Sequence, residues 1–117
     1  MPITPIQTKH KKEIWLVSLN DTEGHEQSGT RPVIVFAVHR QAKVCFVVPI
    51  TKNQDVTRFP YTHAVSRSTI NGLTYDSVAQ IYQMRCLTNS RFITRLGIIE
   101  QNEFNAIITL IIDYLGI

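Results

Sequence analysis

The sequence contains only two cysteines, Cys45 and Cys86, and they do not form a CxxC pair. Both fall in apolar stretches, VCFVVPI and MRCLT, so we expect two small buried core residues rather than a disulfide. No apolar run approaches the roughly 18 residues of a membrane span, and the polar, proline-broken start MPITPIQTKHKK has no apolar centre of a signal peptide. We therefore expect a soluble, cytoplasmic protein that contacts no membrane.

Charged residues are also few, at 18% of the 117 residues, with 12 Lys and Arg against 9 Asp and Glu. The net charge of +3 suits a surface that meets phosphates or an acidic protein, but it decides nothing alone. Hydrophobic residues make up 44%, which is typical of a globular protein, and the length fits one domain. We predict a flexible lead-in over residues 1–12 and a single domain over residues 13–117.

Familiar catalytic motifs are missing, since the chain has no GxSxG, P-loop, GxGxxG or HExxH sequence. The four histidines, His10, His25, His39 and His63, are too scattered along the chain to predict a metal site. We expect neither a metal nor a cofactor.

The apolar pattern predicts mainly strands. EIWLVSL at residues 13–19 alternates, and PVIVFAV and VCFVVPI are apolar runs with a short polar connection, which is typical of an antiparallel hairpin buried on both faces. Weaker strands are expected at YTHAVS, at SVAQIYQM over residues 77–84 and at RCLT, with a turn near Asn71 and Gly72.

The C-terminal segment predicts an amphipathic helix that packs on the sheet. Its apolar residues recur at i, i+3, i+4, i+7, i+8 and i+11, and Gly116 is placed to end the helix. These residues are Phe104, Ile107, Ile108, Ile111, Ile112 and Leu115. The whole pattern predicts a mainly β fold, an antiparallel barrel closed by a C-terminal helix.

The most unusual local composition is GHEQSGTRPVIVF at residues 24–36, directly before and into an apolar strand. Pro32 favours an extended conformation at Arg31. Thr51, like Arg31, lies at a boundary between an apolar strand and a polar loop. If the two strands form a hairpin, both side chains lie at one edge of the sheet, within reach of one phosphate. The alternative is a solvated loop, a surface arginine and a threonine that satisfies backbone groups.

Three stretches resemble the MazF/PemK/Kid toxins of bacterial toxin–antitoxin pairs, from about Glu13 to the C-terminus. EIWLVSLNDTEGHEQSGTRPVIVF is similar to the family's first strand, its loop with the E-Q-x-G-x-R-P-V signature, and the next strand. VVPIT matches a strand with its terminal threonine, and DSVAQIYQMRCLTNSR is a degraded form of D-S-V-A-x-x-D-Q-I-R-T-I-D-K-S-R. The GHEQ sequence points to the PemK/Kid branch.

This resemblance implies an SH3-like barrel with helices, a homodimer, and sequence-specific, metal-independent cleavage of single-stranded RNA. It also implies neutralisation by an acidic antitoxin with a disordered segment. In such a reaction the 2′-hydroxyl attacks the scissile phosphate. The matching positions make Arg31 the cation that stabilises the developing charge and Thr51 a hydrogen-bond donor to the same phosphate.

The resemblance fails at two positions of the branch's chemistry. An arginine and an aspartate that take part in catalysis are replaced here by Gln80 and Tyr82. His25 is the remaining candidate for a general base at neutral pH, and the alternative is a histidine that only contacts RNA or solvent. Substrate contacts are expected from residues at matching positions, with Tyr82 able to stack on a base. They are Glu26, Gln27, Gln80, Tyr82 and Gln83.

Two other functions stay open from the residues. CcdB toxins share the barrel and inhibit DNA gyrase by binding, and their Trp-Gly-Ile end is only partly matched by Leu115 followed by Gly-Ile. A relative that binds RNA or protein without catalysis is the other, because of the changes at Gln80 and Tyr82.

Overall fold

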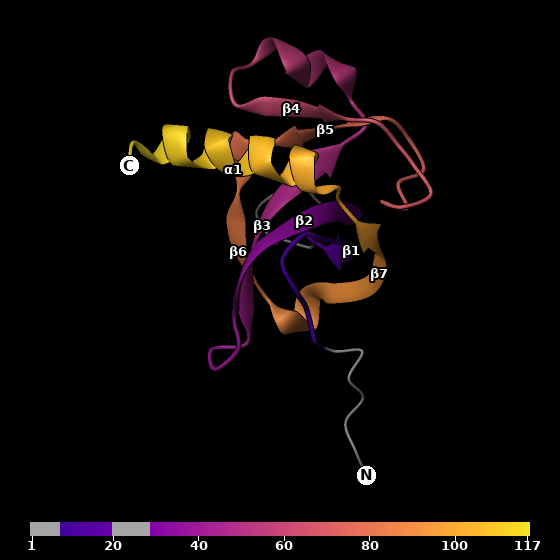
Figure 1. Ribbon diagram of the computed structural model, residues 1–117. Coiled ribbons are helices and arrows are strands. Elements are labelled where there is room, and N and C mark those ends of the chain that lie inside the picture. Colours follow the sequence, from indigo (N-terminus) through magenta and orange to yellow (C-terminus); the bar gives the residue numbers. More distant parts are fainter. Residues whose placement is uncertain (1–7, 20–28) are drawn as a thin grey trace.

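The computed structural model describes residues 8–19 and 29–117, which form seven strands and one α-helix (Figure 1). The strands are β1 (Glu13–Ser18), β2 (Thr30–His39), β3 (Val44–Thr51), β4 (Thr62–Val65), β5 (Ser77–Gln80), β6 (Arg85–Thr88) and β7 (Phe92–Ile98). The helix α1 spans Gln101–Leu115, and short 3₁₀ turns lie at Gln54–Arg58, Ile81–Gln83 and Asn89–Arg91. The hydrogen-bonded order is β4-β5-β3-β2-β1-β7, with β6 also paired to β3, and all of these pairings are antiparallel.

The hairpin of β2 and β3 is the centre of the sheet. Val33 pairs with Pro49 and Val35 with Val47, and the register shifts between Val35 and Ala37. On its other side β3 pairs with β6 through residues 44–47 and with β5 through residues 50–51. One strand therefore joins two parts of the sheet and curves it toward a barrel. The predicted hairpin is confirmed.

The helix covers this sheet with one apolar face (Figure 1). Phe104, Ile107 and Ile111 are buried against the core that includes Ile34 and residues of β3 and β5. Gly116 ends the helix in a left-handed conformation (φ 76°), and its N–H group donates to the carbonyls of residues 112 and 113. The predicted amphipathic helix and its glycine stop are confirmed.

Only part of the apolar face of α1 is buried against the sheet. Ile112 and Leu115 belong to the predicted apolar stripe, yet they are 45% and 54% exposed. The sheet ends before the last helical turns, so these side chains are left without a layer to cover them (Figure 1).

Two local predictions are wrong, and one strand was not predicted. The predicted strand over residues 77–84 ends at Gln80, because residues 81–83 turn into a 3₁₀ helix. Cys86 is exposed, since Leu87 of the same four-residue strand faces the core and its neighbours must point outward. The strand β7 was not predicted, because FITRLGI carries no clean alternation and lies at the edge of the sheet, where only Gly97 of its seven residues is buried.

The described end of the lead-in, residues 8–12, packs on the sheet. Lys9 is 2% exposed, and its ammonium lies 5.0 Å from the ring centroid of Trp15 and 5.1 Å from that of Phe92. Burial lowers the pKa of Lys9. Glu13 accepts hydrogen bonds from the N–H of His10 and the indole of Trp15, both at 2.9 Å. The domain boundary at residue 12 stays a prediction.

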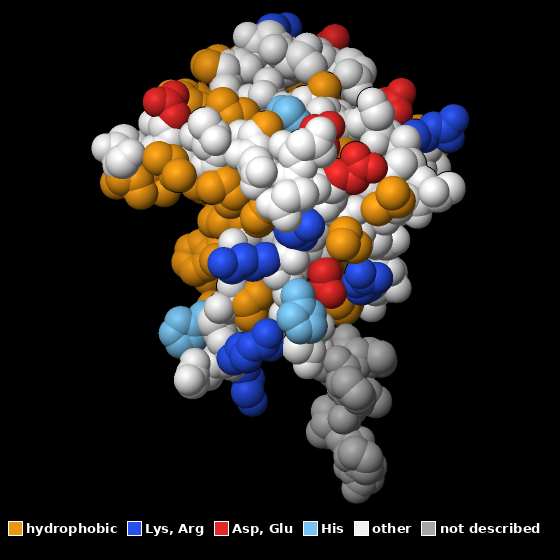
Figure 2. Space-filling view, viewed as in Figure 1, with side chains coloured by type: hydrophobic (Ala, Val, Ile, Leu, Met, Phe, Trp, Pro, Cys, Tyr) orange, Lys and Arg blue, Asp and Glu red, His pale blue; other side chains and the backbone are white. Residues whose placement is uncertain are grey.

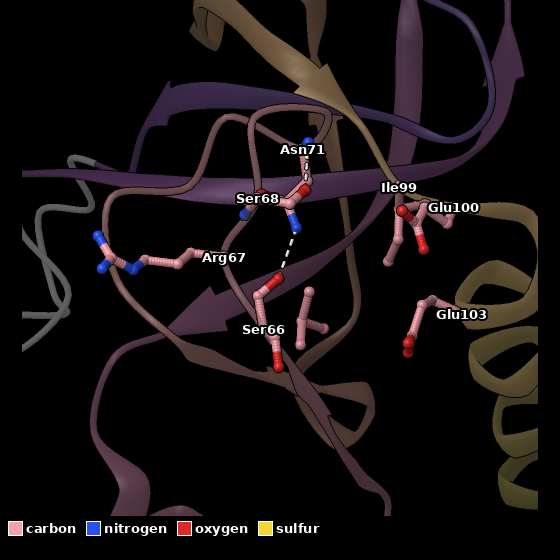
Figure 3. A pocket seen from close by; sticks show the side chains of 8 residues that line it. Ser66, Arg67, Ser68, Asn71, Ile99, Glu100 and Glu103 are labelled. Atoms are coloured by element: carbon pink, nitrogen blue, oxygen red, sulfur yellow. Dashed lines mark hydrogen bonds between the residues drawn. The ribbon is translucent and has the colours of Figure 1, made fainter.

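Asn71 organises the loop between β4 and β5. Its amide nitrogen donates to the carbonyl of Ser66 at 2.8 Å, and its amide oxygen accepts from the N–H groups of Ser68 and Leu73, both at 3.0 Å (Figure 3). Gly72 follows with φ 71°, which confirms the predicted turn. A small hollow of about 200 Å³ separates this loop from Glu100 and Glu103 near the start of α1 (Figure 3).

Candidate functional site

Arg31 and Thr51 lie at the open end of the β2–β3 hairpin. Each is two residues beyond the Val33–Pro49 pair, so the register brings them opposite one another. Arg31 also pairs with Val17 of β1, and Thr51 with Val78 of β5. The backbones of both residues are held between neighbouring strands, and both side chains are half-buried.

The two residues line one groove of about 450 Å³. Its floor is apolar, from Leu16, Ile50 and Leu73, and its walls carry the polar groups of Arg31 and Thr51. A mostly apolar hollow with a few convergent polar groups is typical of a ligand site. The sequence prediction that these two side chains share one edge of the sheet is confirmed; their catalytic roles stay a prediction.

The electrostatics of the groove favour an anion. Burial lowers the pKa of Arg31, but a guanidinium stays protonated at neutral pH. Within residues 8–19 and 29–117, no carboxylate forms an ion pair with Arg31. A half-buried cation without such a partner attracts a phosphate strongly, because water screens it less than it screens a surface charge.

Thr51 has a defined hydrogen-bond direction. Its hydroxyl oxygen accepts from the N–H of Asn53 at 3.1 Å. A hydroxyl has one proton and two acceptor sites, so this bond leaves the proton available for a ligand in the groove.

The structure does not bring Gln80, Tyr82 and Gln83 into this groove. Thr51 pairs with Val78, and β5 runs on for two further residues before Gln80 ends it, about 7 Å along the strand. Gln80 is 6% exposed and donates from its amide nitrogen to the hydroxyl of Tyr82 at 3.1 Å. Tyr82 packs edge-on against Phe59, with ring centroids 6.0 Å apart, and Gln83 is exposed.

Gln80 carries a buried polar atom that needs explanation. In the part of the chain that the structure covers, its amide oxygen has no hydrogen-bond partner. Such atoms are rare, because a buried unpaired acceptor costs about 1–3 kcal/mol.

His25, Glu26 and Gln27 lie outside the described residues. The described residues on either side of them are in contact, since the carbonyl of Gly29 accepts from the N–H of Leu19 at 3.0 Å.

Sequence reasoning missed two side chains of the groove, Lys52 and Tyr75. Lys52 follows Thr51 directly, and Tyr75 stands just after the turn at residues 71 and 72. Their proximity depends on the β3–β5 pairing, which no short-range pattern reveals.

Among the described residues, no group of three His, Cys, Asp or Glu side chains converges as metal ligands would. No helix in this part is long and apolar enough to cross a membrane.

The fold resembles known toxin structures. MazF from Deinococcus radiodurans matches with a TM-score of 0.77 over 93% of this chain and 97% of that one, at 17% identity. An endoribonuclease from a Mycobacterial species, solved in complex with its cognate antitoxin, matches with a TM-score of 0.73 over 94% and 97% of the two chains, at 16% identity. These likenesses show that the chain has the SH3-like barrel fold of those structures.

Sequence comparisons give the family. The endoribonuclease PemK of Escherichia coli is 49% identical over 49 residues, which cover 39% of this chain and 37% of that protein. The endoribonuclease MazF9 of Mycobacterium tuberculosis is 30% identical over 99 residues, which cover 78% and 82% of the two chains. A family model for PemK-like, MazF-like toxins of type II toxin–antitoxin systems matches residues 10–115. The chain therefore belongs to this toxin family, and these matches give no support to the CcdB alternative.

Proposed function

We propose that this toxin is an endoribonuclease that cleaves single-stranded RNA at specific sequences without a metal ion. The observation that carries the proposal is the shared groove of Arg31 and Thr51, with a half-buried cation and an oriented hydroxyl at its wall. Two related proteins, PemK and MazF9, carry the name endoribonuclease, and this supports the same activity here.

The groove's chemistry fits attack by the 2′-hydroxyl. The 2′-oxygen forms a bond to phosphorus, and the bond from phosphorus to the 5′-oxygen breaks, which yields a cyclic phosphate and a free 5′-hydroxyl. The 2′-hydroxyl proton goes to a base, and the leaving oxygen takes up a proton. Arg31 stabilises the charge that builds on the phosphoryl oxygens, and Thr51 donates a hydrogen bond to the same group.

Replacing Arg31 tests the proposal. The purified protein should cleave a long single-stranded RNA in EDTA, leave DNA intact, and produce 5′-hydroxyl ends that can be mapped. Arg31→Ala should slow cleavage by about 10²–10³-fold, the usual cost of removing a donor to the transition state, while the protein stays folded. Single-turnover rates measure this effect.

Arg67→Ala is the matched control, because it removes the same charge from an exposed arginine that does not line the groove of Arg31 and Thr51. We expect it to cleave within a few-fold of the wild-type rate. An Arg31→Ala protein as active as the control would contradict the assignment, and so would cleavage that EDTA abolishes.

We also propose an acidic antitoxin as partner. An endoribonuclease of similar fold from a Mycobacterial species was solved in complex with its cognate antitoxin, and MazE–MazF structures are known from Deinococcus radiodurans. The net charge of +3 favours an acidic, disordered segment that lies across the RNA site, and so does Arg31, with which no carboxylate of residues 8–19 and 29–117 forms an ion pair. Titration calorimetry with the cognate antitoxin should show affinity that falls with salt, and salt-independent binding would oppose this model.

The oligomeric state and the cellular location of the protein are further proposals. We infer a homodimer, held by the exposed apolar face of α1, and a cytoplasmic site of action where RNA is present. The apolar groove beside α1, lined by Phe36 and Ile108, supports the dimer.

A further inference from the structure

The groove of Arg31 and Thr51 continues beyond the reacting phosphate. Lys52 and Tyr75 line the same hollow and come from the loops that follow β3 and precede β5. Neither residue has a role in the reaction proposed above. Their side chains are a cation and an aromatic ring, the two groups that single-stranded nucleic acid sites combine.

Tyr75 presents a large ring to solvent from a fixed backbone. The side chain is 55% exposed, which is high for an aromatic residue. Its own carbonyl accepts from the hydroxyl of Ser77 at 2.7 Å. The next residue, Asp76, is held on both sides: its carboxylate accepts from the N–H of Arg67 at 2.9 Å, and its carbonyl accepts from the side-chain amide of Gln54 at 3.1 Å. A ring held in place loses little entropy when a partner stacks on it.

Lys52 places a positive charge over this ring. Its ammonium lies 4.6 Å from the ring centroid of Tyr75. No carboxylate in residues 8–19 or 29–117 forms an ion pair with Lys52. The ammonium is thus positioned by a cation–π contact and keeps its charge available for an anion.

We propose that Tyr75 and Lys52 form a nucleotide subsite next to the scissile bond. Tyr75 stacks on the base of a flanking nucleotide, and Lys52 contacts that nucleotide's phosphate while Arg31 and Thr51 hold the reacting one. The geometry fits, because Lys52 is adjacent to Thr51 in the chain, about 3.8 Å away between Cα atoms, and its long side chain reaches a neighbouring phosphate. Every base has a stacking face, so this subsite adds affinity without selecting a sequence.

This inference rests on the proposed ribonuclease function, and substrate and protein changes together test it. Once the wild-type cleavage site is mapped, two short RNAs are prepared, one intact and one abasic at the nucleotide beside the scissile bond. They are cleaved by wild type, Tyr75→Ala, Tyr75→Phe and Lys52→Gln. Ile70→Ala is the control, because Ile70 is 52% exposed on the same loop but does not line the groove.

Tyr75→Ala should lower kcat/KM on intact RNA by about 10-fold or more through a higher KM, since stacking one base contributes on that order. Tyr75→Phe keeps the ring and should stay close to wild type. The abasic RNA should be a poorer substrate for wild type but not for Tyr75→Ala, which has already lost the stack. Lys52→Gln should reduce the slope of log affinity against log salt by about 0.7, the value for one phosphate on a single strand.

The outcomes separate this subsite from the catalytic proposal. If wild type cleaves RNA, and Tyr75→Ala behaves like Ile70→Ala on both substrates, the subsite is wrong and the ribonuclease assignment stands. If wild type cleaves nothing, the assignment fails, and fluorescence anisotropy with two single-stranded RNAs of equal length, one intact and one abasic throughout, still tests the subsite. Equal binding of both RNAs by wild type would then overturn it.

Discussion

Arg31 illustrates how one residue acquires a function from its position in the sheet. Pro32 follows it and pairs with Leu16 in β1, so the backbone at Arg31 is extended and its neighbours are apolar. Half-burial lowers the pKa of the guanidinium without neutralising it. A phosphate that enters the groove therefore meets a cation whose direction is set by the backbone, and little reorganisation is needed in the transition state.

The general base is the missing role, and His25 is the candidate from the sequence. We predict that His25→Gln slows the chemical step by about 10²–10⁴-fold, because glutamine forms hydrogen bonds but takes up no proton at neutral pH. Single-turnover cleavage at saturating RNA isolates this step from binding. The acid limb of the wild-type rate profile should lie near pH 6.5, the ordinary pKa of histidine, and should vanish in the variant.

A change confined to KM would assign His25 to RNA contact only. A rate within a few-fold of wild type, with the acid limb retained, would show that another group takes the proton and that Arg31 and Thr51 work without His25.

At the scale of elements, the loop between β4 and β5 supports the groove from one side. Leu73 forms part of the groove floor, and Tyr75 lies at its rim. Hydrogen bonds of the side chains of Asn71 and Asp76 hold the loop. Gly72 lets the loop pass close to β7, where the N–H of Ile98 donates to the carbonyl of Ile70 at 3.1 Å. The conformation of a single glycine therefore sets the position of two groove residues.

Two glycine variants test this close approach. Gly72 and Gly116 have nearly the same positive φ, 71° and 76°. A Cβ added at Gly72 would lie 2.1 Å from the carbonyl oxygen of Leu96, whereas a Cβ added at Gly116 would have no atom within 4 Å. We predict that Gly116→Ala lowers the free energy of unfolding by about 1–2 kcal/mol, the cost of a left-handed alanine. Gly72→Ala should cost about 1–3 kcal/mol more, because backbone must move.

Urea unfolding of the two variants gives the difference. Equal losses would mean that β7 yields without cost and that the loop is not held by this contact. Cleavage activity of the folded Gly72→Ala protein should also fall, while that of Gly116→Ala should not, since only the first glycine lies in the loop that carries Leu73 and Tyr75.

The elements also show what the sequence could and could not predict. Two apolar runs with a short link predict the hairpin, and a 3.6-residue period of apolar residues predicts the helix. The sequence therefore predicts correctly that Arg31 and Thr51 share one edge of the sheet and that Gly116 ends the helix. SVAQIYQM shows the limit: its apolar residues fit a longer strand, but the chain turns at Ile81. Gln80 is consequently buried at a strand end and not in the groove.

The groove itself was only half predictable. Arg31 and Thr51 meet through a hairpin, whose register a short connection fixes. Lys52 and Tyr75 meet through the pairing of β3 with β5, which are separated by a long irregular segment, and no periodicity encodes such a contact.

At the scale of the whole molecule, one surface remains apolar. Ile108, Ile112 and Leu115 follow one another at i, i+4 and i+7 along α1, so they form a line on one side of the helix. Ile108 borders a groove of about 400 Å³ with Phe36, and Phe36 packs edge-on against Phe46, which is 43% exposed. Figure 2 shows apolar side chains gathered beneath the C-terminal half of α1 and along the sheet below it.

This surface has the features of a contact between two copies of the chain. A two-fold interface brings the same patch of both subunits together. The projecting side chains of one subunit can therefore fill the groove of the other subunit. The exposed residues Ile112 and Leu115 project, and the groove beside Ile108 and Phe36 receives. A stable dimer needs about 800 Å² from each partner, and the length of a 15-residue helix with an adjoining sheet face can supply it.

We predict that wild-type protein scatters light at micromolar concentration with about twice the 13.4 kDa mass of one chain, and that Ile112→Glu shifts it to the mass of a monomer. A buried carboxylate without a partner opposes association strongly, because it must lose its hydration. Ile93→Glu is the control: Ile93 is 53% exposed on β7, away from α1, and its variant should remain dimeric. Circular dichroism checks that both variants are folded. A monomeric wild type would refute the dimer, and a dimeric, folded Ile112→Glu would place the interface on another surface of the toxin.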